Sequence, residues 1–236
     1  MEENTPIQVP ASPSYAVPFA IVIAGIAIAG AIYFGDNKKT VPAVAAGKPQ
    51  VAGTVDPVTP VDHILGNPNA EVIIVEYSDT ECPFCKSFHS TMQRVMGEYG
   101  DSGKVAWVYR HFPLPFHSKA PKEAEATECA NKLGGNVKFW EYTNKIFEVT
   151  LGNNQLDPAE LPKIAKTVGL DVTAFNTCLA SGEMKAIVDA NMASGNKAGV
   201  SGTPHSIVLV DGKVVTAING AQPYEQVKAV IDELLK

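Results

Sequence analysis

Alternating apolar and polar positions divide residues 71–236 into short strands and longer helices. Runs rich in β-branched residues predict four strands, at 71–78, 104–112, 205–210 and 213–220. The pair Asp211-Gly212 separates the last two strands and predicts a hairpin. Apolar residues recur every three or four positions from Phe84, and Gly100 ends the pattern, so an amphipathic helix is expected there. A final helix is expected over about 223–235.

Almost ninety residues separate the second predicted strand from the third, and their apolar spacing is helical. The pattern predicts five helices, at about 126–133, 137–149, 157–169, 171–182 and from 184 onward. Ala126, Cys129, Ala130 and Leu133 are expected to share one apolar face. For the third helix, Asp157 is the expected N-cap of a capping box. The order strand, helix, strand, helical block, hairpin, helix predicts an α/β fold, a mixed sheet with helices on both faces.

Composition narrows the class of protein. The chain has 236 residues, 45% of them apolar, which excludes a wholly disordered or collagen-like protein. The net charge is −6 and the pI is near 5.4, with lysines and arginines scattered along the chain. No basic face for nucleic acid is therefore expected.

The first sixty residues differ from the rest in composition. A polar tail at 1–15 precedes nineteen uncharged residues at 16–34, about the length of a helix that crosses a bilayer. We interpret 16–34 as a retained transmembrane anchor and the Pro-, Ala- and Gly-rich 35–62 as a flexible linker. A soluble domain at 63–236 would follow.

A cleaved signal peptide is the rival interpretation of residues 16–34. Small residues such as Ala27 and Ala29 resemble a cleavage site, but the preceding tail contains Glu2 and Glu3 and no basic residue. Orientation is a further difficulty, because lysines follow the segment and none precedes it. That distribution favours a cytoplasmic domain, although the rule is weak for long translocated domains.

The stretch "SDTECPFCKSFH" contains two of the four cysteines of the chain, at the junction of a predicted strand and helix. With Cys82 as N-cap and Pro83 as the first helical residue, the Cys82 sulfur lies beside the free N–H groups of the helix. A thiolate is favoured there, with a pKa lowered to roughly 3.5 to 7. Cys85, one turn later, is within reach to close a disulfide. The pair is therefore expected to be redox-active and to need no other cofactor.

Two other interpretations of this pair are a zinc site and a static bridge. Zinc needs four ligands, and neither a second Cys-x-x-Cys nor a His-x-x-x-His occurs in the chain. No metal site is therefore expected. A static bridge that closes so small a ring would add little stability.

The motif "IVEYSDTECPFCKSFH", with "GVSGTPHSIVLVDG" far downstream, resembles the DsbA family of thiol-disulfide oxidoreductases. The resemblance covers about residues 63–236 and implies a thioredoxin-like fold with a helical insertion at about 113–199. It also implies that Cys82 is the nucleophile and Cys85 the resolving thiol. Pro204 matches the family's cis-proline, opposite the cysteines.

Further site residues follow from the same resemblance. Glu76 occupies the position of a buried acid that assists proton transfer to or from the resolving cysteine, although it could also face solvent. Pro83, Phe84, Thr203 and His205 are expected to contact the substrate chain. Some relatives carry histidine where this chain has Phe84, which leaves the oxidising strength open. His89 and His205 are candidates for an effect on the cysteine pKa or for structural roles.

Cys129 and Cys178 fall on the buried faces of two predicted helices. They are either two buried thiols or a disulfide. An oxidising compartment favours the disulfide, which would contribute about 4 kcal/mol by closing a loop of ~50 residues. Similar pairs in some DsbA-like proteins support this expectation.

The function expected from these features is a membrane-tethered dithiol oxidase, single-pass, with its catalytic domain on the extracytoplasmic side, as in a periplasm. Its expected substrates are reduced exported proteins, and its expected reoxidant is an integral-membrane, quinone-linked thiol oxidase. A reductase or isomerase would use the same chemistry. A non-catalytic chaperone module that holds extended chains, or a zinc-binding adaptor, would belong to other classes.

Overall fold

The computed structural model describes residues 53–236. The tail and anchor expected at 1–34, and the linker up to residue 52, lie outside the described residues. Within 53–236, no helix combines the length and the apolar character needed to cross a membrane.

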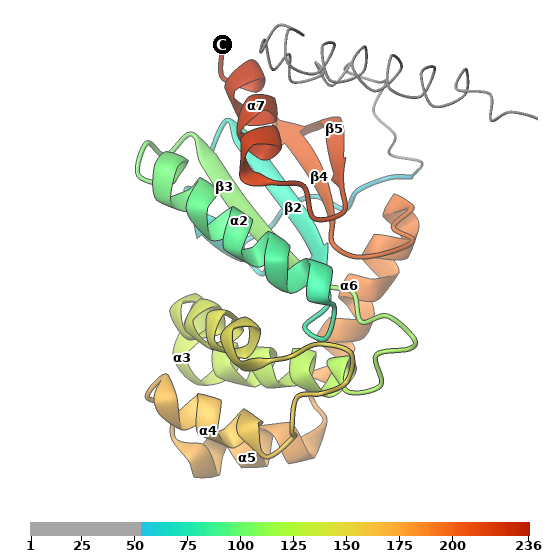
Figure 1. The fold of residues 1–236 in the computed structure, drawn as a ribbon. Coiled ribbons are helices and arrows are strands. Elements are labelled where there is room, and N and C mark those ends of the chain that lie inside the picture. Colours follow the sequence, from blue (N-terminus) through green and yellow to red (C-terminus); the bar gives the residue numbers. More distant parts are fainter. Residues whose placement is uncertain (1–52) are drawn as a thin grey trace, which may run out of the picture. The chain divides into compact units, whose positions relative to one another are not determined.

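Five strands form one mixed sheet in the order β1-β3-β2-β4-β5. The strands are β1 (His63–Gly66), β2 (Val72–Ser78), β3 (Val105–His111), β4 (His205–Val210) and β5 (Lys213–Asn219). The central pair β2 and β3 is parallel, and the remaining neighbours are antiparallel (Figure 1). The four predicted strands are confirmed to within one residue at each end. The sequence missed β1, a four-residue edge strand too short to show alternation.

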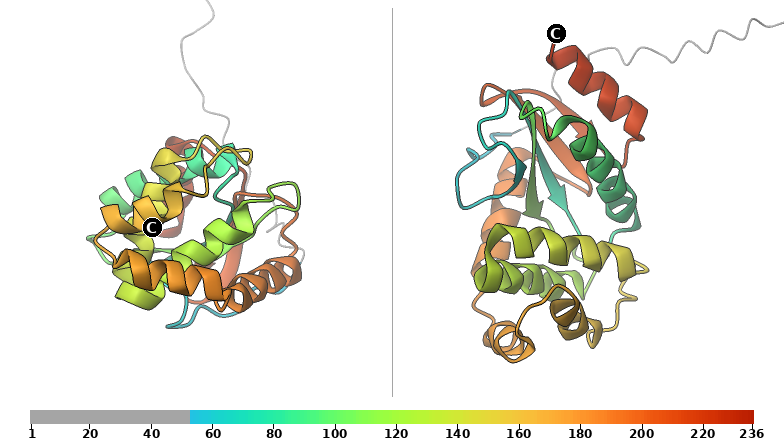
Figure 2. Two further views of the ribbon diagram at one scale, coloured as in Figure 1. Left: turned by 90° about the horizontal axis from the view of Figure 1, so that it is seen from below. Right: turned by 90° about the vertical axis from the view of Figure 1, so that its left-hand side faces the viewer.

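Alternation along β2 assigns its side chains to the two faces of the sheet. Val72 and Ile74 belong to one apolar cluster, whereas Ile73 and Val75 belong to the other. The first face is covered by α2 (Pro83–Tyr99) and α7 (Tyr224–Leu234), and the second by α6 (Lys185–Ala198). The right-hand view of Figure 2 shows α2 and α7 on one side of the sheet and α6 on the other. Helices therefore cover both faces, as predicted.

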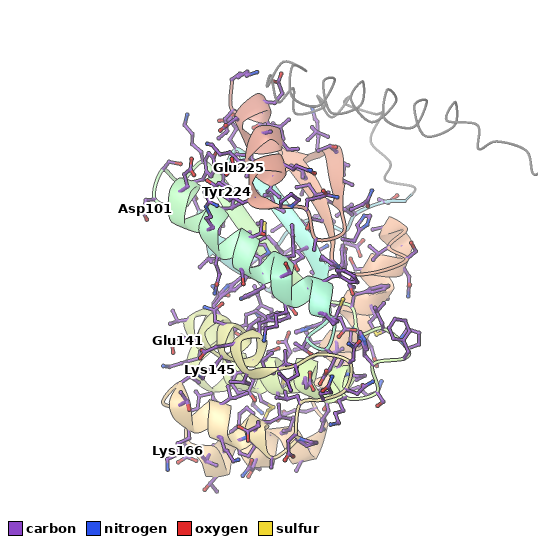
Figure 3. All side chains as sticks on the ribbon, viewed as in Figure 1. Asp101, Glu141, Lys145, Lys166, Tyr224 and Glu225 are labelled. Atoms are coloured by element: carbon purple, nitrogen blue, oxygen red, sulfur yellow. A yellow bond between two sulfur atoms is a disulfide. The ribbon has the colours of Figure 1, made fainter. Side chains whose placement is uncertain are left out.

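The helix α7 packs along α2, which carries the reactive motif. The guanidinium of Arg94 in α2 lies 3.5 Å above the ring of Tyr224 and within 3.6 Å of the Glu225 carboxylate. Figure 3 labels both α7 residues beside α2. The contact holds the two helices of this face together at their exposed rim.

The helical insertion consists of α3 (Ala120–Val149), α4 (Glu160–Thr167), α5 (Val172–Ser181) and α6. Gly135 has φ 69° and divides α3 by a kink, which accounts for the two helices that the sequence predicted there. Leu133, expected on the buried face, is instead 37% exposed because it lies close to the kink. Asp157 does not cap α4 either: its carboxylate accepts from the N–H of Ala159 in a preceding turn, and α4 begins three residues later than Asp157.

The last part of the predicted linker packs on the domain. The N–H of Thr54 donates to the carbonyl of Lys197 at 3.2 Å. The buried Arg110 donates to the carbonyls of Asp56 and Pro57 at 3.2 and 3.1 Å and to the carboxylate of Asp62 at 2.8 Å. Residues 54–62 therefore belong with the domain rather than with a free tether.

Candidate active site

The reactive motif lies where β2 gives way to α2. Cys82 is the N-cap, with extended backbone angles of φ −83° and ψ 118°, and Pro83 occupies the first helical turn. Proline is suited to this position because its missing N–H has no partner to lose. Cys82 is 4% exposed and Cys85 is fully buried, and both are free thiols in this structure. The sequence therefore places one sulfur at the tip of the helix and the other one turn inside.

The two thiols differ strongly in acidity. The thiol of Cys85, the backbone N–H groups of Cys85 and Phe84, and the contact with Thr203 together lower the pKa of Cys82 to about 6, against the opposing effect of burial. Burial and the adjacent Cys82 raise the pKa of Cys85 well above that of a free thiol. At neutral pH, Cys82 is therefore the thiolate and Cys85 keeps its proton. This asymmetry is what a nucleophile and a resolving thiol require.

The loop before β4 lies opposite Cys82. The Cys82 Sγ lies 3.5 Å from the carbonyl oxygen of Thr203, to which it donates when it is a thiol. The Thr203–Pro204 peptide bond is cis, and Pro204 itself is buried. Residues 121 positions apart thus meet at one sulfur, and the structure brings Thr203 and Pro204 to the site as the family resemblance implied.

Glu76 is fully buried on the face of the sheet that carries α2. Its Oε2 accepts from the indole N–H of Trp107 at 2.9 Å. Its Oε1 finds no hydrogen-bond partner among the described residues. Burial raises the pKa of Glu76 to about 7, so the group exchanges protons near neutral pH. The alternative that Glu76 faces solvent is therefore wrong.

Two neighbours of Glu76 were not predicted from the sequence as part of the site. Tyr109 lies opposite Glu76 in the register of β2 and β3, and Ser78 lies two residues along β2. Both hydroxyls are buried and lack a hydrogen-bond partner within residues 53–236. Burial raises the pKa of Tyr109 well above that of a free tyrosine, and the charges of Glu76 and Cys85 raise it as well. The sequence offered one signal for each residue, a hydroxyl group within a mostly apolar strand. Such a hydroxyl does not by itself reveal which residue it would face.

A buried carboxylate directly before Cys82 fixes the neighbouring loop. Both oxygens of Glu81 are used: Oε2 accepts from the N–H of Asn154 at 2.7 Å and Oε1 from that of Leu156 at 3.1 Å. Burial, followed by the effect of the Glu81 carboxylate, raises the pKa of Glu123 to about 8. The sequence did not indicate that Glu81 and Glu123 interact, because the two residues are more than forty positions apart.

Apolar side chains surround the helix tip at the surface. Phe84 is 67% exposed, and Phe116 and Leu151 are exposed to a similar degree. The loop of Leu151 abuts the helix tip, since a Cβ at Gly152 would lie 3.0 Å from the Pro83 ring. Sequence reasoning found Phe84 and Pro83 and missed the other two, which come from loops of the insertion. Pro83, Phe84 and Leu151 thus form an apolar rim at the helix tip, and Phe116 lies in a loop where its carbonyl accepts from the Asn154 side chain at 2.9 Å. This rim suits contact with an unfolded chain.

The two candidate histidines carry no charge at neutral pH. His89 Nε2 lies 2.8 Å from the Asn144 side chain, and burial lowers the pKa of His89 to about 4. Burial also lowers the pKa of His205, which follows Pro204 directly. A neutral imidazole offers no electrostatic support to a thiolate, so His89 is best understood as part of the aromatic core with Trp107 and Phe147.

The other two cysteines are joined in the helical insertion. Cys129 of α3 and Cys178 of α5 form a disulfide with an S–S distance of 1.99 Å and a Cα–Cα distance of 5.9 Å. Both residues are buried. The bond ties the two helices together and closes a loop of the length that the sequence indicated.

An acidic thiol at a helix tip and a buried thiol of raised pKa one turn behind it can carry out thiol-disulfide exchange, and this pair resembles the site of DsbA-like thiol-disulfide oxidoreductases. The family model described as "Thioredoxin" matches residues 58–233, and the chain belongs to this family. The match begins within residues 54–62, in agreement with the packing of this segment on the domain.

Two solved structures are similar to this chain. DsbA2 of Pseudomonas aeruginosa is 28% identical, with a TM-score of 0.64, over 75% of this chain and 96% of that chain. Oxidised BdbD of Bacillus subtilis is 25% identical, with a TM-score of 0.66, over 78% of this chain and 98% of that one. The fold and the helical insertion are therefore shared along nearly the whole length of these proteins.

A curated relative is a much longer protein. The Na(+)/H(+) antiporter NhaA 1 of Mycolicibacterium gilvum is 34% identical over 116 residues, which are 49% of this chain and 18% of that protein. The present chain thus spans about a fifth of the length of this relative.

Proposed function

We propose that the protein is a membrane-anchored dithiol oxidase that introduces disulfides into exported proteins through Cys82 and Cys85. The observation that carries the direction of electron flow is the pKa of Cys82, lowered to about 6. A stabilised thiolate favours the reduced form of the pair, so the Cys82–Cys85 disulfide accepts electrons readily. The apolar rim at Phe84 supports a substrate that is still unfolded.

The cycle begins with the Cys82–Cys85 disulfide. A substrate thiolate attacks the Cys82 sulfur, the Cys82–Cys85 bond breaks, and Cys85 leaves as a thiolate that takes up a proton. A second substrate thiolate then attacks the substrate sulfur of the mixed disulfide. The Cys82 thiolate departs, and the substrate keeps a new disulfide. Two electrons have passed from the substrate to the enzyme, which leaves reduced.

Glu76 supplies the proton that Cys85 takes up. Its carboxyl group is buried on the same side of the sheet as Cys85, and its charge contributes to the raised pKa of that thiol. With a pKa of about 7, Glu76 is partly protonated at neutral pH and can give up or regain a proton as the pair is reduced or reoxidised.

The substrate chain contacts the surface on both sides of Cys82. Pro83 and Phe84 present an exposed apolar edge, and the backbone at Thr203 offers polar groups to an extended chain. His205 lies at the start of β4 beside this backbone. The exposed Phe116 and Leu151 extend the apolar edge toward the helical insertion.

The cellular setting is inferred from two features of the chain. The uncharged segment 16–34 supports a single membrane anchor, and the Cys129–Cys178 disulfide supports an oxidising, extracytoplasmic compartment. An enzyme that leaves each cycle reduced needs a reoxidant. We assign that role to an integral-membrane, quinone-linked thiol oxidase.

The deciding experiment is the equilibrium potential of the Cys82/Cys85 couple against glutathione. A value above about −200 mV is expected for an oxidant. A value near the roughly −270 mV of thioredoxin would overturn the oxidase in favour of a reductase. Cys82→Ser distinguishes an enzyme from a chaperone module: oxidation of reduced peptides must vanish, whereas a holdase would keep all of its effect on unfolded chains.

A further inference from the structure

A second buried polar cluster lies where the helical insertion meets the sheet. His63 begins the edge strand β1, His111 ends β3, and Glu128 belongs to α3. The antiparallel pairing of β1 with β3 places His63 opposite Tyr109, two residues from His111. All three side chains are at most 6% exposed. Three ionisable groups from three elements therefore converge at one point inside the protein.

The geometry of this cluster centres on one carboxylate oxygen. The Nε2 atoms of His63 and His111 lie 2.7 and 2.9 Å from the same Oε1 of Glu128. The three potential ligand atoms all lie within 4.8 Å of one another. The ring of His63 is held in place by stacking on Phe139, with centroids 3.5 Å apart. Fixed imidazole nitrogens and a carboxylate oxygen are the donor atoms that zinc takes in three-ligand protein sites.

Hydrogen bonds alone leave this cluster incomplete. Oε2 of Glu128 is buried and has no hydrogen-bond partner among residues 53–236. Within the same residues, the only ion-pair partners of Glu128 are the two histidines. A buried carboxylate oxygen that has no hydrogen-bond partner is costly. A bound cation removes that cost and gives the second oxygen a partner.

We propose that His63, His111 and Glu128 bind one divalent transition-metal ion, for which Zn²⁺ is the appropriate probe. Two imidazoles favour zinc and its neighbours over calcium and magnesium, which prefer oxygen ligands. Each imidazole would bind the ion through Nε2 and carry its proton on Nδ1. The Thr127 hydroxyl lies 3.3 Å from His111 Nε2 and donates to the carbonyl of Ala124 at 2.8 Å.

Binding requires a small adjustment of the cluster. Ligand atoms at about 2.0–2.1 Å from a tetrahedral zinc ion are separated by roughly 3.3 Å. The two contacts to Oε1, at 2.7 and 2.9 Å, must therefore widen by a few tenths of an ångström. The role of the ion is structural, because it joins β1, the end of β3 and α3 at a point sealed from solvent. Glu128 precedes Cys129, so the ion and the disulfide hold the same turn of α3 from two directions.

The sequence could not indicate this site. Its ligands are separated by 48 and 17 positions, as the numbers 63, 111 and 128 show. None belongs to a short metal-binding motif, so the expectation of no metal site rested on spacing alone.

The test uses the full chain with Cys82→Ser and Cys85→Ser, which removes the thiols that bind zinc by themselves. We expect one zinc ion per chain by elemental analysis, and calorimetric binding of Zn²⁺ that is much tighter than binding of Ca²⁺ or Mg²⁺. X-ray absorption should report only nitrogen and oxygen ligands. In the same background, His111→Ala should weaken zinc binding at least about 10-fold, the loss seen when even an outer partner of a metal site is removed.

Two further variants keep the test decisive. Glu128→Gln preserves shape if His111→Ala fails to fold, and it should also weaken zinc binding at least about 10-fold. The matched control is His89→Gln, which alters a buried histidine outside the cluster and should leave zinc binding unchanged. Absence of stoichiometric zinc, equal affinity in Glu128→Gln, or a preference for Ca²⁺ would each overturn the proposal. Because the redox cysteines are absent, none of these results bears on the proposed oxidase.

Discussion

The two cysteine pairs have opposite chemistry although all four sulfurs are buried. Cys82 and Cys85 are free thiols at the start of a helix, where the Cys85 thiol and the nearby backbone N–H groups lower the pKa of Cys82. Cys129 and Cys178 lie in the interior of two helices and form a disulfide. Burial therefore does not decide reactivity. The neighbours of a sulfur do, because the adjacent Cys85 thiol and the free N–H groups at the helix start stabilise the Cys82 thiolate that attacks and leaves.

The largest effect is expected from Cys82→Ser. A serine hydroxyl stays protonated at neutral pH and forms no mixed disulfide, so oxidation of reduced peptides should fall by roughly 1000-fold or more. The assay is the rate of disulfide formation in a reduced model peptide. The matched control is the double variant Cys129→Ala/Cys178→Ala, assayed below its melting temperature, which should retain activity. Equal losses of activity in Cys82→Ser and in the double variant would contradict the proposed difference between the two cysteine pairs.

Stability should depend on the other pair. Cys129 and Cys178 are 49 residues apart, and in the chain-entropy model their bond contributes about 4 kcal/mol. We expect Cys129→Ala/Cys178→Ala to lose that much in free energy of unfolding, measured by urea denaturation. Reduction of the Cys82–Cys85 disulfide should bring no comparable loss, since that bond closes a very small ring and the stabilised Cys82 thiolate favours the reduced form. A larger cost for the small ring would contradict this account.

Glu76→Gln should separate the proton chemistry of the redox pair from its stability. Burial raises the pKa of Glu76 from 4.5 to about 7, so the folded protein holds a proton that the unfolded chain releases near pH 4.5. The free energy of unfolding therefore falls as pH rises from about 4.5 to 7, by about 3 kcal/mol in total. Glutamine retains the hydrogen bond from Trp107 and cannot ionise. At pH 8 the variant should be the more stable protein by up to about 3 kcal/mol.

The same variant should be a poorer enzyme. Without a proton donor for Cys85, the reaction with substrate should slow by about 100-fold, the lower end of the range for general acid–base catalysis. Unfolding curves at pH 4 and pH 8 and rates across the same range provide the measurements. A variant that keeps the wild-type pH profile of the rate would show that Glu76 takes no part in proton transfer.

The smallest expected effect concerns the residue before Cys85. Phe84→His introduces an imidazole that can be positively charged beside the Cys82 thiolate. The pKa of Cys82 should fall by about one unit below its present value near 6, because the exposed position of residue 84 weakens the interaction. The thiolate absorbance followed through a pH titration reports the change. Phe84→Asn, which adds no charge, should leave the pKa close to that of the wild type.

Local features of the chain were sufficient to predict the reactive thiol and most of the elements. A cysteine followed by proline at the end of a β-branched run identifies a helix start, and hence a favoured thiolate, from a few neighbouring residues. The strands and the hairpin at Asp211-Gly212 were predictable for the same reason. The exceptions were β1, which has only four residues, and two helix starts: α3 begins at Ala120 rather than near residue 126, and α4 begins after the turn that Asp157 closes.

Only the tertiary structure decided the surroundings of that thiol. Glu76 became a buried acid because β2 is covered on both faces, and strand alternation does not say which side is closed. Thr203 reaches Cys82, and His63 and His111 reach Glu128, through strand pairings that join distant parts of the chain. The physical reason is the distance along the chain over which each interaction acts. A helix terminus acts within one turn, whereas burial and long-range contacts exist only once the sheet and the helical insertion have packed together.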